Sequence, residues 1–218
     1  MKNTNQKRLY IGAGLLALFV LWTVALRFVD VKEIGPLGSS VGFATLNKLV
    51  HRVTGVHMWL YTITDWLGLI PFFFIIGFGV LGLVQWIKRK SILKVDLNIL
   101  SLGGFYITVM AAYIFFEIFV LNYRPILING ILEASYPSST TMLVMCVMPT
   151  AIIQFNFRIK RLAVKRFINL AIAVFIAFMV LGRLISGVHW FSDIIGGTLL
   201  SGGLVMLYYF TCSFGGKS

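Results

Sequence analysis

Long apolar runs separated by short polar stretches dominate the chain. A helix needs roughly 20 apolar residues to cross a bilayer, and each run comes close to that length. We therefore expect six membrane-spanning helices, at about Tyr10–Val29, Gly68–Ile87, Leu97–Leu121, Thr140–Phe155, Phe167–Ile185 and Ile194–Cys212. The pattern predicts an all-α integral membrane protein.

The first apolar run follows the basic residues Lys7 and Arg8, as the core of a signal peptide would. The run is long for such a core, and no cleavage site of small residues follows it, so we interpret it as an uncleaved span. Residues 30–67 are the least apolar stretch, and in them Lys48 and Arg52 share a segment with apolar residues. This mixture is typical of a helix in the head-group layer, so we expect an interfacial helix between spans one and two.

Loops that are rich in Lys and Arg alternate along the chain with loops that contain few of these residues. If the amino terminus is cytoplasmic, thirteen Lys and Arg lie on the cytoplasmic side and six on the other. The thirteen are Lys2, Lys7, Arg8, Lys88, Arg89, Lys90, Lys94, Arg158, Lys160, Arg161, Lys165, Arg166 and Lys217. Of the acidic residues, only Asp96 lies on the cytoplasmic side. Because cytoplasmic loops of membrane proteins are enriched in Lys and Arg, both termini are predicted to be cytoplasmic.

Composition excludes a soluble fold. Of 218 residues, 59% are hydrophobic and 12% are charged, and the mean hydropathy is +0.92. Soluble domains have about 45–50% apolar residues and about 25% charged residues. We expect one membrane domain over residues 1–218, with no separate soluble domain. The net charge of +12 lies in clusters between the apolar runs, where it contacts membrane lipids, so nucleic-acid binding is not expected. Cys146 and Cys212 lie in apolar stretches and give no support to a disulfide framework or a zinc site.

Three distant segments place unusual polar residues at the predicted outer ends of the spans. Glu117 and the pair Arg124-Pro125 follow span three, the run Tyr136–Thr141 begins span four, and the junction of spans five and six carries the remaining ones, Arg183, His189 and Asp193. The topology brings all three segments to one membrane level. With no separate soluble domain, any active site must be built from span ends and loops such as these.

Each of these residues has a role if the ligand is a phosphate. The guanidinium groups of Arg124 and Arg183 can hold phosphate oxygens in paired hydrogen bonds. Hydroxyls and free N–H groups at a helix start, here Ser138, Ser139 and Thr140, form an anion site. His189 and Asp193 are four residues apart, so on a helix the carboxylate could accept from one ring nitrogen while the other attacks phosphorus. Gly182 and Gly187 permit sharp backbone geometry at the junction.

Taken singly, these residues also have ordinary structural interpretations. Arginines near span ends extend to the interface, a lone histidine there is commonly a solvated cap, and Ser or Thr starts many helices. Their joint placement at one face favours a functional site.

The spacing Arg183-x5-His189-x3-Asp193, with Arg124-Pro125 and the run Pro137-Ser138-Ser139-Thr140, resembles the three-part signature of the type 2 phosphatidic acid phosphatase superfamily. The resemblance covers about residues 100–215. It implies a six-span enzyme that removes phosphate from lipid phosphates or diphosphates. It further implies a phosphohistidine at His189, an orienting role for Asp193, and phosphoryl binding by Arg124, Arg183 and the Ser138 region. Neither a metal nor another cofactor is implied.

The chain departs from that family's pattern at four positions: Glu117 stands in place of Lys, Ser139 of Gly, Thr140 of His and Gly182 of Ser. The absent histidine is the family's general acid for the departing alcohol, and threonine donates a proton poorly near neutral pH. A phosphate leaving group has less need of an acid, so the change favours a diphosphate substrate. Glu117 could pair with Arg124, seven residues on, or repel substrate; a protonated Glu117 replacing the missing acid is a further hypothesis.

We therefore expect a lipid phosphatase of a bacterial-type plasma membrane that acts on the outer face on a polyprenyl diphosphate such as undecaprenyl diphosphate. Alternative interpretations are a phosphatidylglycerophosphate or phosphatidate phosphatase, a lipid phosphotransferase, or a protein that binds lipid phosphates without cleaving them. The expected partners are the lipid substrate and membrane lipids. The sequence indicates no oligomeric state.

Overall fold

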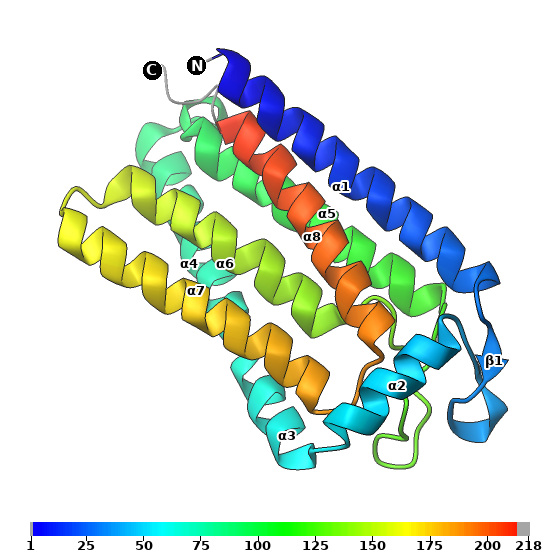
Figure 1. The fold of residues 1–218 in the computed structure, drawn as a ribbon. Helices are drawn as coiled ribbons and strands as arrows, with labels where there is room; N and C mark the ends of the chain where they lie inside the picture. The colour runs from blue at the N-terminus through cyan, green and yellow to red at the C-terminus, as the bar shows by residue number, and fades with distance from the viewer. Residues whose placement is uncertain (1, 213–218) are drawn as a thin grey trace.

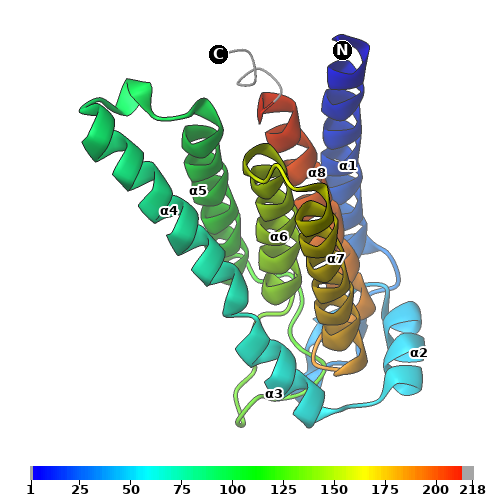
Figure 2. The same ribbon diagram turned by 90° about the vertical axis from the view of Figure 1, so that its left-hand side faces the viewer.

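The computed structural model describes residues 2–212; Lys217, counted above with the cytoplasmic basic residues, lies outside the described residues. These residues form helices that run side by side as a bundle, with shorter elements at one end (Figures 1 and 2). The helices are α1 (Lys2–Phe28), α2 (Ala44–Thr54), α3 (Met58–Leu67), α4 (Ile70–Arg89), α5 (Leu97–Ile118), α6 (Ser139–Arg158), α7 (Leu162–Ile185) and α8 (Phe191–Cys212).

Short elements complete the chain. The strands β1 (Lys32–Glu33) and β2 (Ser40–Val41) form an antiparallel ribbon in which Lys32 pairs with Val41 and Glu33 with Ser40. The 3-10 turn η1 (Pro36–Gly38) joins these two strands, and η2 (Ile92–Lys94) lies between α4 and α5.

Six helical segments of the described chain are long and apolar enough to cross a membrane, which confirms the predicted all-α membrane fold. Their bounds are Thr4–Phe28, Met58–Arg89, Leu97–Ile118, Ser139–Arg158, Leu162–Ile185 and Phe191–Cys212. The predicted second span, about Gly68–Ile87, corresponds to α4. The helical segment that contains it begins at Met58, because α3 leads through a short break at Gly68-Leu69 directly into α4. The helix expected between spans one and two corresponds to α2.

Helix α8 packs against α1, α5 and α6 (Figure 1). The close approach of α1 and α8 depends on glycines that face the partner helix. A Cβ at position 203 would lie 2.7 Å from Cδ2 of Leu16, and one at position 12 would lie 3.2 Å from the Gly203 carbonyl oxygen. Small residues at such contacts are what allow helices to associate closely in a membrane.

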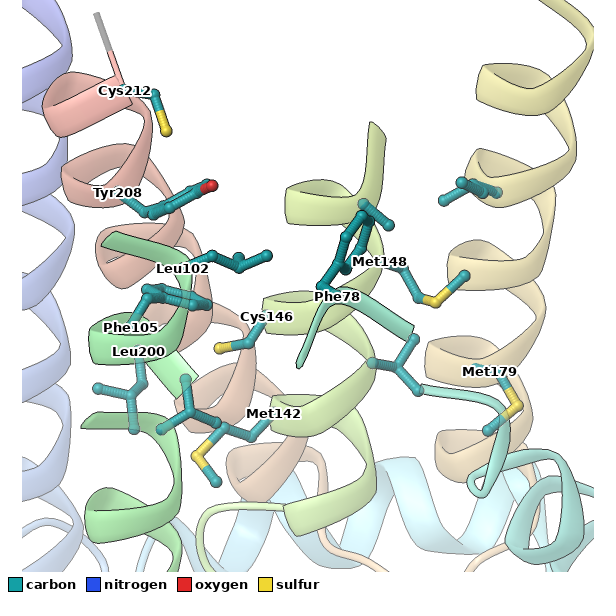
Figure 3. Packing of buried hydrophobic residues seen from close by; sticks show 14 of the residues in the cluster. Phe78, Leu102, Phe105, Met142, Cys146, Met148, Met179, Leu200, Tyr208 and Cys212 are labelled. Atoms are coloured by element: carbon teal, nitrogen blue, oxygen red, sulfur yellow. The ribbon is translucent and has the colours of Figure 1, made fainter. Parts of the chain in front are cut away.

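Side chains from α4 to α8 meet in the middle of the bundle (Figure 3). Leu102 and Phe105 from α5 pack beside Cys146 of α6 and Leu200 of α8. Cys146 and Cys212 are buried free thiols. The apolar core thus joins the spans whose ends carry the candidate site residues.

The two ends of the bundle differ in what they carry. The start of α1, the end of α8, and the α4–α5 and α6–α7 loops lie at one end, whereas α2, α3, the ribbon and residues 119–138 lie at the other (Figure 2). All three segments with candidate chemistry reach this second end. The convergence expected from the order of the spans is therefore present.

Helix α2 does more than lie at an interface, because it is bonded to the turn between α7 and α8. The buried Asn47 amide donates to the Gly42 carbonyl at 2.8 Å and to Ser192 Oγ at 2.9 Å, and its oxygen accepts from the Ser192 N–H at 3.0 Å. His51 Nε2 lies 3.1 Å from the Gly187 carbonyl oxygen. These bonds hold the turn that carries His189.

Candidate active site

Residues 122–135, between α5 and α6, fold back on themselves as a hairpin. At its tip, Ile128 and Ile131 exchange backbone hydrogen bonds of 3.0 and 2.9 Å around Asn129-Gly130, both of which have positive φ. That dipeptide favours a two-residue turn because both positions tolerate positive φ. Farther from the tip, the Ser135 N–H donates to the Asn122 carbonyl at 2.9 Å.

The turn between α7 and α8 carries His189 just before the first residue of α8. Gly187 has φ +70°, and a Cβ there would lie 2.0 Å from the Gly55 carbonyl oxygen. The sharp geometry expected at Gly187 is thus present, and no other residue fits against the chain at Gly55. Gly182 instead lies inside α7, so the same expectation is wrong for that position.

Asp193 lies in the first turn of α8, fully buried, and both carboxylate oxygens are hydrogen-bonded. Oδ2 accepts from the Trp190 N–H at 2.9 Å, which is the contact of a helix-capping carboxylate. Oδ1 accepts from the Asn122 amide and the Ser192 hydroxyl, each at 3.3 Å. The carboxylate is therefore fixed in place from the hairpin and from its own helix.

Ser135 links His189 to Asp193. Its hydroxyl donates to Asp193 Oδ2 at 2.5 Å and lies 2.9 Å from His189 Nδ1, whereas Nδ1 and Oδ2 are 4.0 Å apart. Because the carboxylate only accepts, the serine proton points to Asp193 and its lone pair accepts from Nδ1–H. The predicted direct contact between imidazole and carboxylate is thus wrong, because His189 precedes α8 and the two residues do not share a helix face.

The other ring nitrogen of His189 faces Arg183. With Nδ1 protonated, Nε2 carries the lone pair of the ring and accepts a hydrogen bond from Arg183 Nη2 at 3.4 Å. Arg183 is 1% exposed, and its Nε and Nη1 have no hydrogen-bond partner among the described residues. Nη1 lies 3.6 Å from Asp65 Oδ1, and the Tyr61 ring centre lies 5.0 Å from Cζ.

Arg124, in the hairpin, is the second buried guanidinium. Its Nε lies 3.0 Å from Glu133 Oε2, although Nε and Nη1 are not aligned for hydrogen bonds to described residues. The predicted pairing of Arg124 with Glu117 is wrong, since α5 ends at Ile118 and helical spacing does not extend to position 124. Glu117 is exposed and lines a small cavity with Ser135 and Ser139.

The start of α6 docks onto the histidine segment, since the Ser138 N–H donates to the Asp193 carbonyl at 3.1 Å. Ser138 Oγ is buried and has no hydrogen-bond partner among the described residues. Ser139 and Thr140 are half-buried in the first turn of α6, and both line a cavity of about 290 Å³ that also contains Asp65. The three predicted anion-binding residues therefore lie between Asp193 and the Asp65–Arg183 pair.

Two buried guanidinium groups lie close enough to His189 to act on its protonation. Burial, followed by the charges of Arg124 and Arg183, lowers the pKa of His189 well below its ordinary value, while hydrogen bonding to Ser135 acts in the opposite direction. The imidazole is thus neutral at physiological pH, with its lone pair on Nε2. Buried donors without acceptors carry a desolvation cost that a bound phosphoryl group would offset.

Four residues of the site were not predicted from the sequence. Asn122 and Ser135 come from the hairpin, which the pair Asn129-Gly130 between two isoleucines could have indicated. Tyr61 and Asp65 are four apart on α3 and both contact Arg183; only that spacing hinted at a shared face. Among residues 2–212, no group of three His, Cys, Asp or Glu side chains is arranged to hold a metal ion.

Comparisons with known proteins agree with this geometry. A family model described as the PAP2 superfamily matches residues 14–214. The comparison with curated proteins gave no match. The chain is similar to a solved structure described as the first transmembrane PAP2 type phosphatidylglycerolphosphate phosphatase from Bacillus subtilis. The two share 16% sequence identity and a TM-score of 0.66 over 94% of this chain and 96% of that one, which shows a common fold.

Proposed function

Since the chain belongs to the PAP2 superfamily, we propose that it removes the terminal phosphate of a polyprenyl diphosphate, such as undecaprenyl diphosphate, through a phosphohistidine at His189. The resemblance read from the three-part signature is confirmed at the level of the family, and the chain is a multi-pass membrane phosphatase. The lipid, the residue roles and the membrane side are our proposal.

The orientation of His189 carries the proposal. Nδ1 donates to Ser135, which donates to Asp193, so the nucleophilic lone pair of Nε2 points at the Arg183 guanidinium 3.4 Å away. A phosphoryl group held by Arg183 and Arg124 would lie in front of Nε2. As Nε2 bonds to phosphorus the ring becomes cationic, and Asp193 stabilises that charge through Ser135.

The diphosphate preference rests on Thr140. In the sequence motif, Thr140 stands where the family has the histidine that acts as general acid. A threonine hydroxyl does not readily supply a proton near neutral pH. A lipid monophosphate leaves as a stable anion, whereas the alkoxide of a monophosphate ester needs protonation. The chain is therefore suited to cleave a bond between two phosphates.

The membrane side follows from charge. The start of α1, the end of α8 and the loops rich in Lys and Arg lie at one end of the bundle, and His189 lies at the other (Figure 2). With the basic loops in the cytoplasm, the site faces outward from a plasma membrane of bacterial type.

Phosphate release from two lipids tests the function. Purified wild type and His189→Ala would each be given undecaprenyl diphosphate and phosphatidylglycerophosphate, the latter because the similar solved structure is a phosphatase for that lipid. We expect faster release from the diphosphate by the wild type and a loss of release in the variant. Equal release by both proteins would defeat the mechanism.

Further measurements in the same experiment distinguish the alternative functions. A faster reaction with the monophosphate lipid would favour a phosphatidylglycerophosphate or phosphatidate phosphatase. Turnover that requires an added acceptor would favour a phosphotransferase. Tight binding without phosphate release and without acid-labile label on His189 would favour a binding protein.

A further inference from the structure

Helix α3 packs closely against α7 at Gly182. A Cβ at that position would lie 2.7 Å from Cγ2 of Thr64, a side chain that is itself fully buried. The serine of the family's signature would therefore collide with α3. Glycine at position 182 allows α3 to lie close to α7, and Asp65 of α3 then lies beside Arg183 of α7.

A second departure from the signature, Thr140, also lies beside α3. Cγ2 of Thr140 would lie 3.4 Å from a Cβ placed on Gly68, the residue that ends α3. Thr140, Gly68 and Asp65 line the same cavity of about 290 Å³. A larger side chain at position 140 would occupy part of this cavity. Of the four departures from the signature, Gly182 thus makes room for α3, and Thr140 lines the cavity at the end of this helix.

Asp65, an acidic residue that the family's signature does not contain, is one of the residues that line this cavity. Asp65 Oδ1 lies 3.6 Å from Nη1 of Arg183, and Nη2 of the same guanidinium lies 3.4 Å from His189 Nε2. The carboxylate and the nucleophile therefore flank one phosphate-binding group. The Asp65 side chain is 57% exposed and lines the cavity of about 290 Å³.

From this geometry we propose that Asp65 is the proton acceptor that activates water for hydrolysis of the phosphohistidine, in place of the histidine that Thr140 replaces. The inference rests on the proposed function, because it assigns a role in the second half of that reaction. A carboxylate oxygen beside the phosphate-binding guanidinium can accept a proton from water, which is what the role of base requires.

The reaction then divides into two balanced steps. In the first, Nε2 of His189 bonds to the terminal phosphorus, the bridging P–O bond breaks, and its electron pair leaves with the lipid monophosphate. In the second, a water oxygen bonds to phosphorus, Asp65 takes the water proton, and the N–P electron pair returns to Nε2. Inorganic phosphate departs, and Asp65 releases its proton to solvent.

Other acidic residues at this end have different surroundings. Asp193 is fully buried with both oxygens bonded, and Glu133 pairs with Arg124. Glu117 lines another cavity, with a volume of only about 10 Å³, and makes no ion pair with the site arginines. Of these four acidic residues, Asp65 is the one that lies beside Arg183, the guanidinium that contacts His189 Nε2.

The test separates formation of the phosphohistidine from its hydrolysis. Wild type, Asp65→Asn, His189→Ala and the distant control Glu33→Gln would be mixed with undecaprenyl diphosphate labelled in the terminal phosphate, in detergent micelles. We expect Asp65→Asn to form acid-labile label on His189 in a burst, and then to turn over about 10²- to 10⁴-fold more slowly than the wild type. Glu33→Gln should behave as the wild type, and His189→Ala should form no label.

A rescue variant strengthens the test. In the Asp65→Asn background, Thr140→His restores the family's histidine and should raise turnover about tenfold or more, a partial recovery of what one acid–base group contributes.

Four outcomes would overturn the inference. Turnover of Asp65→Asn at the wild-type rate would remove the role, and so would accumulation of label in Glu117→Gln instead. Loss of both label and turnover in Asp65→Asn, without rescue, would show that Asp65 only positions Arg183. Absence of label in the wild type would overturn the proposed function itself, and this inference with it.

Discussion

At the scale of single residues, the Ser135 hydroxyl decides which nitrogen of His189 is free to react. It accepts from Nδ1 and donates to Asp193, at 2.9 and 2.5 Å. In Ser135→Ala, the buried Nδ1–H loses its acceptor, which costs about 1–3 kcal/mol. We expect kcat to fall roughly 10- to 100-fold with little change in KM, because the phosphate-binding arginines remain. A larger effect on KM than on kcat, measured with one lipid diphosphate, would contradict an orienting role.

The pH profile reports on the charges around His189. Protonation of Nε2 removes the nucleophile, and burial with the charges of Arg124 and Arg183 lowers the pKa of the imidazole. The acid limb of kcat/KM should therefore lie below the ordinary imidazole value of about 6.5. Arg124→Gln removes one cause of the shift and should move the limb to higher pH, whereas Arg124→Lys should not. A limb at the same pH in Arg124→Gln and wild type would contradict this account.

The same pKa shift affects stability with a definite sign. Because the folded-state pKa of His189 is depressed, the unfolded chain binds the extra proton first as the pH falls below about 6.5. The contribution of His189 to folding is thus fully present above that pH and is lost as the pH falls toward the folded-state pKa.

Thr140 sets the choice between leaving groups. In Thr140→His, a proton donor returns to the start of α6, so hydrolysis of a monophosphate lipid should accelerate by about 10²- to 10⁴-fold. Hydrolysis of a diphosphate lipid should change much less, since its leaving group is already a stable anion. Relative rates on phosphatidylglycerophosphate and undecaprenyl diphosphate measure the difference. Comparable acceleration on both lipids would refute the leaving-group argument.

At the scale of elements, the contact of α3 with α7 can be tested by volume. Gly182→Ser places a Cβ that would lie 2.7 Å from Thr64 Cγ2, and such overpacking typically costs about 1–3 kcal/mol. We expect a lower Tm in detergent and lower activity, since α3 carries Asp65 away from Arg183. Thr64→Ala in the same chain should restore both, and the control Gly77→Ser, where nothing lies within 4 Å, should change neither. A Gly182→Ser variant with wild-type Tm and activity would disprove the close contact.

The spans and the shorter elements differ in how far the sequence predicts them. Apolar runs located all six spans, because bilayer thickness sets their length. Helix α3 lies within residues 30–67, the least apolar stretch, where the sequence predicts contact with the head-group layer. In the structure, Asp65 of this helix contacts Arg183. That contact depends on packing between distant segments, which residue patterns do not record.

The same limit applies to the site. Spacing indicated His189, Asp193 and the two arginines, since these residues have few structural reasons to share one membrane level. Ser135 and Asn122 gave no such signal, because serine and asparagine are ordinary loop residues. Their role arises only when the hairpin places them on the two oxygens of Asp193.

At the scale of the whole molecule, two opposite ends of the bundle should face different compartments. Ile131 lies at the hairpin tip, at the end that carries His189, and Leu93 lies in η2 at the other end; they are 63% and 89% exposed. Cysteines at either position can be labelled against a low background, because the native Cys146 and Cys212 are buried.

We expect a membrane-impermeant maleimide to label Ile131→Cys in spheroplasts, and to label Leu93→Cys only after the membrane is permeabilised. The physical reason is that the Lys- and Arg-rich loops stay in the cytoplasm, which leaves the hairpin and His189 outside. Both variants should keep phosphatase activity, since neither side chain contacts the site residues described above. The reverse pattern of labelling would place His189 in the cytoplasm and restrict its substrates to lipids of the inner leaflet.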